Sequence, residues 1–234
     1  MAETDLSPAP SLYLVPTPIG NLEDITLRAL RMLREADYIL AEDTRQTQIL
    51  LRHYEISKPL LSFHTYNEHK TLAGLLERLK KGEKLALVSD AGTPGISDPG
   101  FLLVREALRN EIAIECLPGP TALIPALVNS GFPTDRFVFE GFLPHKKGRL
   151  TRLKALATES RTLVLYESPH RLLRLLEELQ THCGPQRMAS VSRELTKKFE
   201  ETQRGHLADL IAYFKMPNRV RGEFVVVVQG YSEN

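Results

Sequence analysis

The stretch that decides the fold is Ser89-Asp90-Ala91-Gly92-Thr93-Pro94-Gly95-Ile96-Ser97-Asp98-Pro99-Gly100. It follows the apolar run Leu85–Val88, which predicts a strand, and it precedes the helical pattern Phe101–Arg109. In an open α/β sheet, ligands bind beyond the carboxyl ends of the strands. Glycines let the backbone approach a ligand closely, and prolines stiffen the path of the chain. We expect a rigid, backbone-lined pocket for a small molecule here, with an ordinary surface loop as the alternative.

The composition is that of a globular protein without a membrane span. Of the 234 residues, 42% are hydrophobic and 25% are charged, which is usual for soluble domains. Only Cys116 and Cys183 are present, without a CxxC pattern, so a disulfide scaffold and a structural zinc site are not expected. The first ten residues lack the apolar core of a signal peptide. We therefore expect a cytoplasmic protein that needs no metal.

The two halves of the chain differ in charge. Residues 1–125 carry 13 Lys and Arg against 17 Asp and Glu, a net charge of −4. Residues 126–234 carry 17 against 12, a net charge of +5. A basic half on a nearly neutral protein is compatible with a polyanionic partner.

Strand and helix patterns alternate five times in the first half, which predicts a mostly parallel sheet covered on both faces. The expected strands are residues 12–15, 38–41, 60–63, 85–88 and 112–117, and the expected helices are 26–36, 47–54, 72–80, 101–109 and 123–129. Gly131-Phe132-Pro133 breaks the pattern, so we place a first domain at residues 11–130 and a second, basic domain at 131–231. The second domain reads as α/β with antiparallel pairs, including strands at 188–193 and 199–204, and its apolar strand 224–228 is predicted to be central.

Three loops that leave first-half strands share one chemistry. Residues 16–21, 89–100 and 118–122 are rich in Pro and Gly and carry few charges. None matches GxGxxG or the phosphate loop GxxxxGK[ST], so a dinucleotide or nucleotide phosphate is not favoured. A ligand with an adenine and a ribose but no phosphate, held by backbone groups, fits better. S-adenosylmethionine is such a ligand.

Long motifs in both halves resemble one known family. In the first half they are VPTPIGNLEDITLRAL at 15–30, AEDTR at 41–45, VSDAGTPGISDPG at 88–100 and LPGPTA at 117–122. In the second half they are EGFLP at 140–144, YESPHR at 166–171, SRELTK at 192–197 and GE at 222–223. Over residues 11 to about 230, the chain resembles the S-adenosylmethionine-dependent methyltransferases of the tetrapyrrole-methylase-like superfamily. Within it, the resemblance is to the methyltransferases of small-subunit ribosomal RNA.

The resemblance implies two α/β domains with S-adenosylmethionine in the cleft between them, in a homodimer. It also implies 2′-O-methylation of a cytidine in the decoding region of 16S ribosomal RNA. By position, it implies cofactor contacts from Pro18, Ile19, Gly20, Asp90, Ala91, Gly92, Thr93, Ile96, Thr121 and Ala122. Tyr166 is added because it ends an expected strand of the second domain. Many relatives extend beyond the last strand by a helical segment that this chain does not include.

Transfer to a ribose hydroxyl suggests a nearby base, because that hydroxyl is a weak acid. Glu42 and Asp43, which follow the second expected strand, and Glu194 are the candidates. Arg45 and Arg193 could hold flanking phosphates through their guanidinium groups. For residues 42–45 the alternative is a helix-capping cluster with an internal ion pair. For residues 192–194 a structural role is an equal alternative.

The densest basic patch lies between residues 145 and 154. Lys146, Lys147 and Arg149 are predicted to bind RNA phosphates, with His145, Arg152 and Lys154 beside them. The alternative is a solvated helix face. His64 and His170 are expected to be structural.

Two other functions remain open from the residues. One is methylation of a tetrapyrrole-like small molecule on the same fold. The other is a non-catalytic protein of ribosome assembly that binds RNA, although such a protein would have no use for the three Pro/Gly loops.

Overall fold

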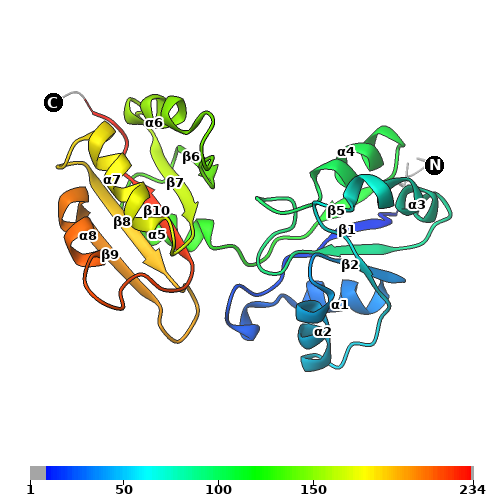
Figure 1. The fold of residues 1–234 in the computed structure, drawn as a ribbon. Helices are drawn as coiled ribbons and strands as arrows, with labels where there is room; N and C mark the ends of the chain where they lie inside the picture. Colours follow the sequence, from blue (N-terminus) through cyan, green and yellow to red (C-terminus); the bar gives the residue numbers. More distant parts are fainter. Residues whose placement is uncertain (1–8, 233–234) are drawn as a thin grey trace, which may run out of the picture. The chain divides into compact units, whose positions relative to one another are not determined.

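The computed structural model describes residues 9–232, which form two compact units (Figure 1). The first unit ends at Thr121 and the second begins at Ala122. This division falls one helix before the boundary predicted from the sequence, because α5 (Leu123–Ser130) packs on strands of the second unit. The first eight residues, where a signal peptide was not expected, lie outside the described part. Within 9–232, no helix has the length and apolar character needed to cross a membrane.

The first unit is a five-stranded sheet in the order β3-β2-β4-β1-β5, with all neighbours parallel. The strands are β1 (Leu12–Leu14), β2 (Tyr38–Ala41), β3 (Leu60–Ser62), β4 (Leu85–Val88) and β5 (Ile114–Cys116). The helices are α1 (Leu27–Glu35), α2 (Thr44–His53), α3 (Glu68–Lys80) and α4 (Phe101–Arg109), with a short 3₁₀ helix at Leu22–Asp24. The predicted alternation of strand and helix is confirmed, and the 3₁₀ helix was not predicted.

Two apolar layers cover the two faces of this sheet. Helices α1 and α2 bury Leu33 and Leu51 against one face, together with Ile39 of β2. Helices α3 and α4 bury Leu79 and Leu103 against the other face. Figure 1 shows α1 and α2 on one side of the strands and α3 and α4 on the other. A parallel sheet buried on both faces explains why its strands are almost continuously apolar.

Local capping fixes the start of α1. Thr26 has extended backbone angles, and its Oγ1 accepts a hydrogen bond of 3.0 Å from the amide of Ala29. A threonine at this position satisfies one of the free amides of the first helical turn. Thr26 is therefore the N-cap of the helix that the sequence predicts over residues 26–36.

The second unit has a five-stranded sheet in the order β6-β7-β10-β8-β9. The strands are β6 (Phe137–Gly141), β7 (Thr162–Glu167), β8 (Met188–Arg193), β9 (Glu201–His206) and β10 (Phe224–Val228). Besides α5, the helices are α6 (Arg149–Ala157), α7 (Leu172–Cys183) and α8 (Leu207–Phe214). Strand β6 pairs parallel with β7, and the other neighbours are antiparallel. The expected hairpin pairing of β8 with β9 and the central place of β10 are both confirmed.

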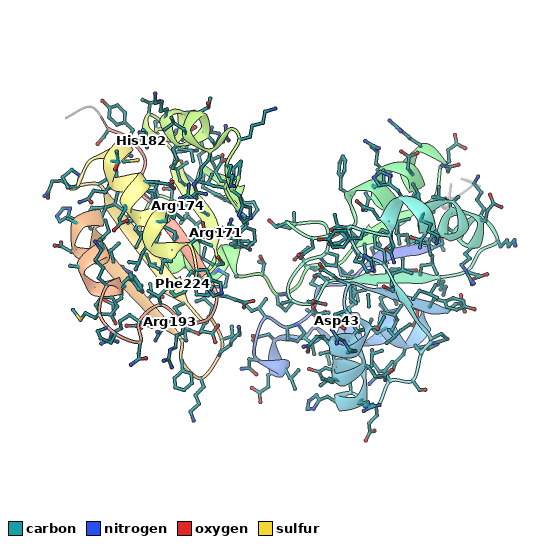
Figure 2. All side chains as sticks on the ribbon, viewed as in Figure 1. Asp43, Arg171, Arg174, His182, Arg193 and Phe224 are labelled. Carbon is teal, nitrogen blue, oxygen red and sulfur yellow. The ribbon has the colours of Figure 1, made fainter. Side chains whose placement is uncertain are left out.

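The strand directions bring the ends of several strands to one edge of the second sheet. Phe224 of β10 stands opposite Glu167 of β7 on one side and opposite Arg193 of β8 on the other. Arg193 in turn stands opposite Glu201 at the start of β9. Figure 2 labels Phe224 and Arg193 close together at this edge. The sheet therefore gathers charged side chains from β7, β8 and β9 beside one another.

Candidate functional site

Three Pro/Gly loops meet at the carboxyl edge of the first sheet. They follow β1, β4 and β5, and these strands are neighbours because β1 lies between the other two. The amide of Thr17 donates to the carbonyl oxygen of Gly92 over 2.9 Å, and the amide of Gly92 returns a bond of the same length. Thr93 Oγ1 donates to the carbonyl oxygen of Pro120 over 3.3 Å. The loops thus lie side by side.

Glycine is required where these loops approach each other most closely. A Cβ on Gly119 would lie 2.6 Å from Cβ of Pro16, which is shorter than real carbon contacts. Gly92 has φ +82°, a left-handed conformation that favours glycine, and a Cβ there would lie 3.6 Å from Cγ2 of Ile19. The loops therefore present main-chain groups to one another, and this suits a ligand recognised through backbone atoms.

The residues predicted to contact a cofactor are divided between the two units. Pro18, Ile19, Gly20, Asp90, Ala91, Gly92, Thr93 and Ile96 lie on the tied loops of the first unit, and Thr121 is the last residue of that unit. Among them Gly20, Asp90, Ala91 and Ile96 are exposed, whereas Gly92 is buried. Ala122 precedes α5, and Tyr166 lies on β7, so both belong to the second unit.

Asp43 caps helix α2 (Figure 2), which is the structural alternative considered for residues 42–45. Its Oδ1 accepts from the amide of Arg45 over 2.8 Å, and its two oxygens accept from the Arg45 guanidinium over 3.0 and 2.7 Å. The hydrogen bonds from Arg45 lower the pKa of Asp43 to about 2. A carboxylate with so low a pKa is a weak proton acceptor, so Asp43 is poorly suited to act as a base.

Glu42 has the opposite electrostatics. Partial burial and the negative charge of Asp90 raise its pKa, and His64 opposes them. A raised pKa makes a carboxylate a stronger base. Of the two neighbouring acids, Glu42 is therefore the better candidate for taking a proton.

The structure adds Asp98, which the sequence analysis did not single out. Burial raises the pKa of Asp98 to about 6, with the charges of Glu42 and Asp90 adding to the effect and a hydrogen bond with Ser89 opposing it. The preceding residue, Ser97, adopts a left-handed conformation with φ 66°. An acid inside a Pro/Gly loop at the carboxyl edge of a parallel sheet was the sequence signal that could have found it.

His64 stands near these acids at the end of β3. Its charge opposes the rise in the pKa of Glu42, and its Nδ1 is buried without a hydrogen-bond partner. Within residues 9–232, no group of three His, Cys, Asp or Glu side chains is arranged to hold a metal ion.

Glu194 is committed to a structural role at the end of β8. Its Oε1 accepts from Lys197 Nζ and from the amide of Glu223, both over 3.0 Å. Burial raises the pKa of Glu194, but these two bonds and the charges of Lys197 and Arg193 together outweigh it and lower the pKa. A Cβ on Gly222 would lie 2.3 Å from the Glu194 carboxyl carbon, so this loop is packed tightly around the carboxylate. The expectation that Glu194 could act as a base is not supported by this geometry.

Arg193 is also held within the second unit. Its Nη2 lies 2.8 Å from Oε2 of Glu201, and its Nη1 donates to the carbonyl oxygen of Arg219 over 3.0 Å. Its side chain is only 14% exposed. A phosphate would have to displace Glu201 to reach it.

The basic patch divides into exposed and buried members. Lys146 and Lys147 are exposed, but the side chain of Arg149 is only 4% exposed. Arg149 Nε donates to Glu178 Oε2 over 2.7 Å, and its Nη1 donates to the carbonyl oxygen of Pro144 over 3.1 Å. Arg149 is therefore poorly placed to bind RNA, because its guanidinium fastens α6 to α7. Arg45, by contrast, has a side chain that is 87% exposed.

The fold, with its three hydrogen-bonded Pro/Gly loops, is that of a class of methyltransferases. The family described as Tetrapyrrole (Corrin/Porphyrin) Methylases matches residues 11–211, so the chain belongs to this family. Within it, the chain is 53% identical over 220 residues to Ribosomal RNA small subunit methyltransferase I from a Synechocystis species, covering 94% of this chain and 78% of the relative. It is 50% identical to the protein of the same name from Thermotoga maritima, covering 94% of this chain and 98% of the relative. The chain is thus a member of the ribosomal RNA small subunit methyltransferase I family.

Solved structures share the fold. Uroporphyrin-III C-methyl transferase from Thermus thermophilus, complexed with S-adenyl homocysteine, superposes with a TM-score of 0.65 at 23% identity. The match covers 93% of this chain and 96% of that one. At this identity the likeness establishes the fold alone.

Proposed function

We propose that this protein transfers a methyl group from S-adenosylmethionine to the 2′-hydroxyl of a cytidine in the decoding region of 16S ribosomal RNA. The observation that carries the proposal is the identity of about one half, along nearly the whole chain, with proteins named for small-subunit ribosomal RNA methylation. We infer that the enzyme works in the cytoplasm, on the small ribosomal subunit, as a homodimer.

The first unit offers a fitting cradle for the cofactor. The loops after β1, β4 and β5 are fastened to one another by main-chain bonds, and a side chain on Gly119 would collide with Pro16. Pro18 to Gly20, Asp90 to Thr93 and Ile96 are the residues that we assign to cofactor contact there. Thr121, Ala122 and Tyr166 remain predicted contacts. When bound, S-adenosylmethionine supplies an electrophilic methyl group on a sulfonium, so accurate positioning of the acceptor accounts for much of the acceleration.

Glu42 is the proton acceptor that we assign to the reaction. It lies at the end of β2, directly beside β4 in the sheet, and its pKa is raised by burial and by Asp90. With the cofactor bound, Glu42 would take the proton of the ribose hydroxyl while the ribose oxygen bonds to the methyl carbon and the carbon–sulfur bond of the sulfonium breaks, leaving a neutral thioether. Asp43 positions the start of α2 and presents Arg45 to solvent, where the guanidinium is available for an RNA phosphate.

Lys146 and Lys147 are the phosphate contacts that we assign to the second unit. Both are exposed on the loop between β6 and α6. Such contacts release counterions from the RNA, so the binding constant should fall steeply as salt is added.

The test is transfer of a labelled methyl group to purified small ribosomal subunits from a strain that lacks this protein. The modified nucleoside is then identified by mass spectrometry. We expect label in one 2′-O-methylcytidine of 16S ribosomal RNA. Label in a porphyrin-like compound and none in the subunits would establish the small-molecule alternative. Subunit binding without any cofactor binding in calorimetry would establish the non-catalytic one.

A further inference from the structure

An exposed aromatic ring stands at the end of β6, directly beside the basic loop of the second unit. Phe142 is 48% exposed. Its ring centroid lies 5.8 Å from that of Tyr166 in an edge-to-face arrangement, and Tyr166 stacks in the same way on Phe139 over 5.0 Å. Phe142 therefore packs against Tyr166, which Phe139 supports in turn, and keeps nearly half of its surface exposed.

A fixed guanidinium accompanies this ring. The central carbon of the Arg171 guanidinium lies 5.8 Å from the centroid of Phe142, and Arg171 Nη2 lies 2.8 Å from Oε1 of Glu167. The Glu167 side chain is fully buried. Arg171 Nη1 also approaches Nε2 of His145 at 3.0 Å. Figure 2 labels Arg171 near the start of α7. A buried carboxylate thus holds one planar cation against an exposed ring.

The charges beside the Phe142 ring favour an anionic partner that also carries planar rings. Lys146 and Lys147 follow His145 directly, and in the described part of the chain no carboxylate lies within ion-pair distance of either lysine. Unpaired RNA is commonly recognised by bases that stack on aromatic rings or on arginine planes, while nearby cations hold the phosphates. A protein partner would have less use for uncompensated lysines beside the ring.

We propose that Phe142 and Arg171 form a stacking site for one unpaired base of the RNA substrate, with Lys146 and Lys147 on the adjoining phosphates. The proposal rests on the proposed function, because it names how that substrate is held. It adds Phe142 and Arg171 to the residues that bind the substrate. Glu167 acts through Arg171 and is a positioning residue.

The test compares Phe142→Ala, Phe142→Trp and Phe199→Ala. Phe199 is a matched control, since it is also an exposed phenylalanine of this unit, 65% exposed, with Lys198 Nζ 5.7 Å from its ring centroid. It has no arginine anchored in the way that Glu167 anchors Arg171. Two measurements are made: the KM and kcat for methyl transfer to unmethylated small subunits, and the affinity for a single-stranded decoding-region RNA that carries 2-aminopurine.

We expect Phe142→Ala to weaken RNA binding and raise KM about tenfold, the usual loss for one stacked base. Quenching of the 2-aminopurine should also diminish, while the slope of affinity against salt should stay unchanged because no charge is removed. Phe142→Trp should restore both measurements, and Phe199→Ala should behave as the unmodified protein.

Equal KM and equal quenching in Phe142→Ala and Phe199→Ala would overturn the proposal. So would an altered oligomeric state of Phe142→Ala with unchanged RNA affinity, which would identify the ring as a contact between copies of the chain. Failure of the proposed function looks different: the unmodified protein would then give no methyl transfer to subunits, whereas the RNA-binding measurement would still report on stacking.

Discussion

The main chains of Thr17 and Gly92 exchange two hydrogen bonds, each of 2.9 Å, beyond the ends of strands β1 and β4. The Thr17 hydroxyl adds a third bond, to the carbonyl oxygen of Ser89 over 3.1 Å, and it is buried. These bonds extend the sheet into its loops and hold the loop after β4 against the loop after β1. The shape of the cradle is therefore set by backbone geometry, and this makes its glycines sensitive positions.

Gly119→Ala should disturb the cradle. The new Cβ would lie 2.6 Å from Cβ of Pro16, in a ring that cannot rotate away. We expect a loss of stability of about 1–3 kcal/mol, as for other overpacked sites, together with a loss of affinity for S-adenosylmethionine of at least about tenfold. Thermal unfolding and calorimetry measure the two effects.

Gly74→Ala is the control for this substitution. Gly74 lies in α3, and nothing stands within 4 Å of a Cβ built on it. Alanine in a helix interior should stabilise the protein by about 0.5–1 kcal/mol and leave cofactor binding unchanged. Equal affinity for the cofactor in both variants would show that the contact between Gly119 and Pro16 does not shape the site.

Glu42→Gln and Asp43→Asn should separate the two neighbouring acids. We expect Glu42→Gln to lower kcat about 100-fold, the usual contribution of a positioned base, and to remove the fall in rate toward acid pH. Asp43 has a pKa of about 2 and caps α2. Asparagine is a good cap as well, so Asp43→Asn should keep most of the activity. The measurement is kcat against pH; a greater loss in Asp43→Asn, with cofactor binding intact, would reverse the assignment.

Asp98 should make stability depend on pH in a definite direction. Its pKa in the folded protein is about 6, raised from 3.8, so between these values the folded state binds more protons than the unfolded state. Stability from this group is therefore full below about pH 4 and is lost as pH rises through 6.

Asp98→Asn removes this titration. Its stability relative to the unmodified protein should therefore increase between pH 4 and pH 7, which urea unfolding at several pH values measures. Parallel curves of unfolding free energy against pH for the two proteins would mean that the charge of Asp98 does not destabilise the folded state.

Arg149→Ala and the double variant Lys146→Ala/Lys147→Ala should act on different properties. Arg149 is buried and paired with Glu178, so its loss should cost about 3 kcal/mol of stability. The double variant should keep its stability and reduce the slope of log affinity for RNA against log salt by about 2. The two measurements are thermal unfolding and RNA binding at several salt concentrations. A salt slope reduced by Arg149→Ala alone, without loss of stability, would return Arg149 to the RNA-binding surface.

The sequence by itself determined the alternation of strands and helices, and with it the side at which the three Pro/Gly loops gather. This follows because apolar periodicity, caps such as Thr26 and breaks at glycine and proline act over a few residues. It also determined that β10 is central, since five consecutive apolar residues require burial on both faces.

Only the tertiary structure decided which charged residues are free. In the sequence, Arg149 is one member of a basic run. In the structure it is buried and paired with the carboxylate of Glu178, 29 positions away. Glu194 is fixed by the amide of Glu223, also 29 positions away. The pKa of Asp98 is raised by its burial and by Glu42, which follows a different strand. The protonation and availability of a charged group depend on its burial and its partners. Contacts between distant parts of the chain set both, and a local sequence pattern does not contain them.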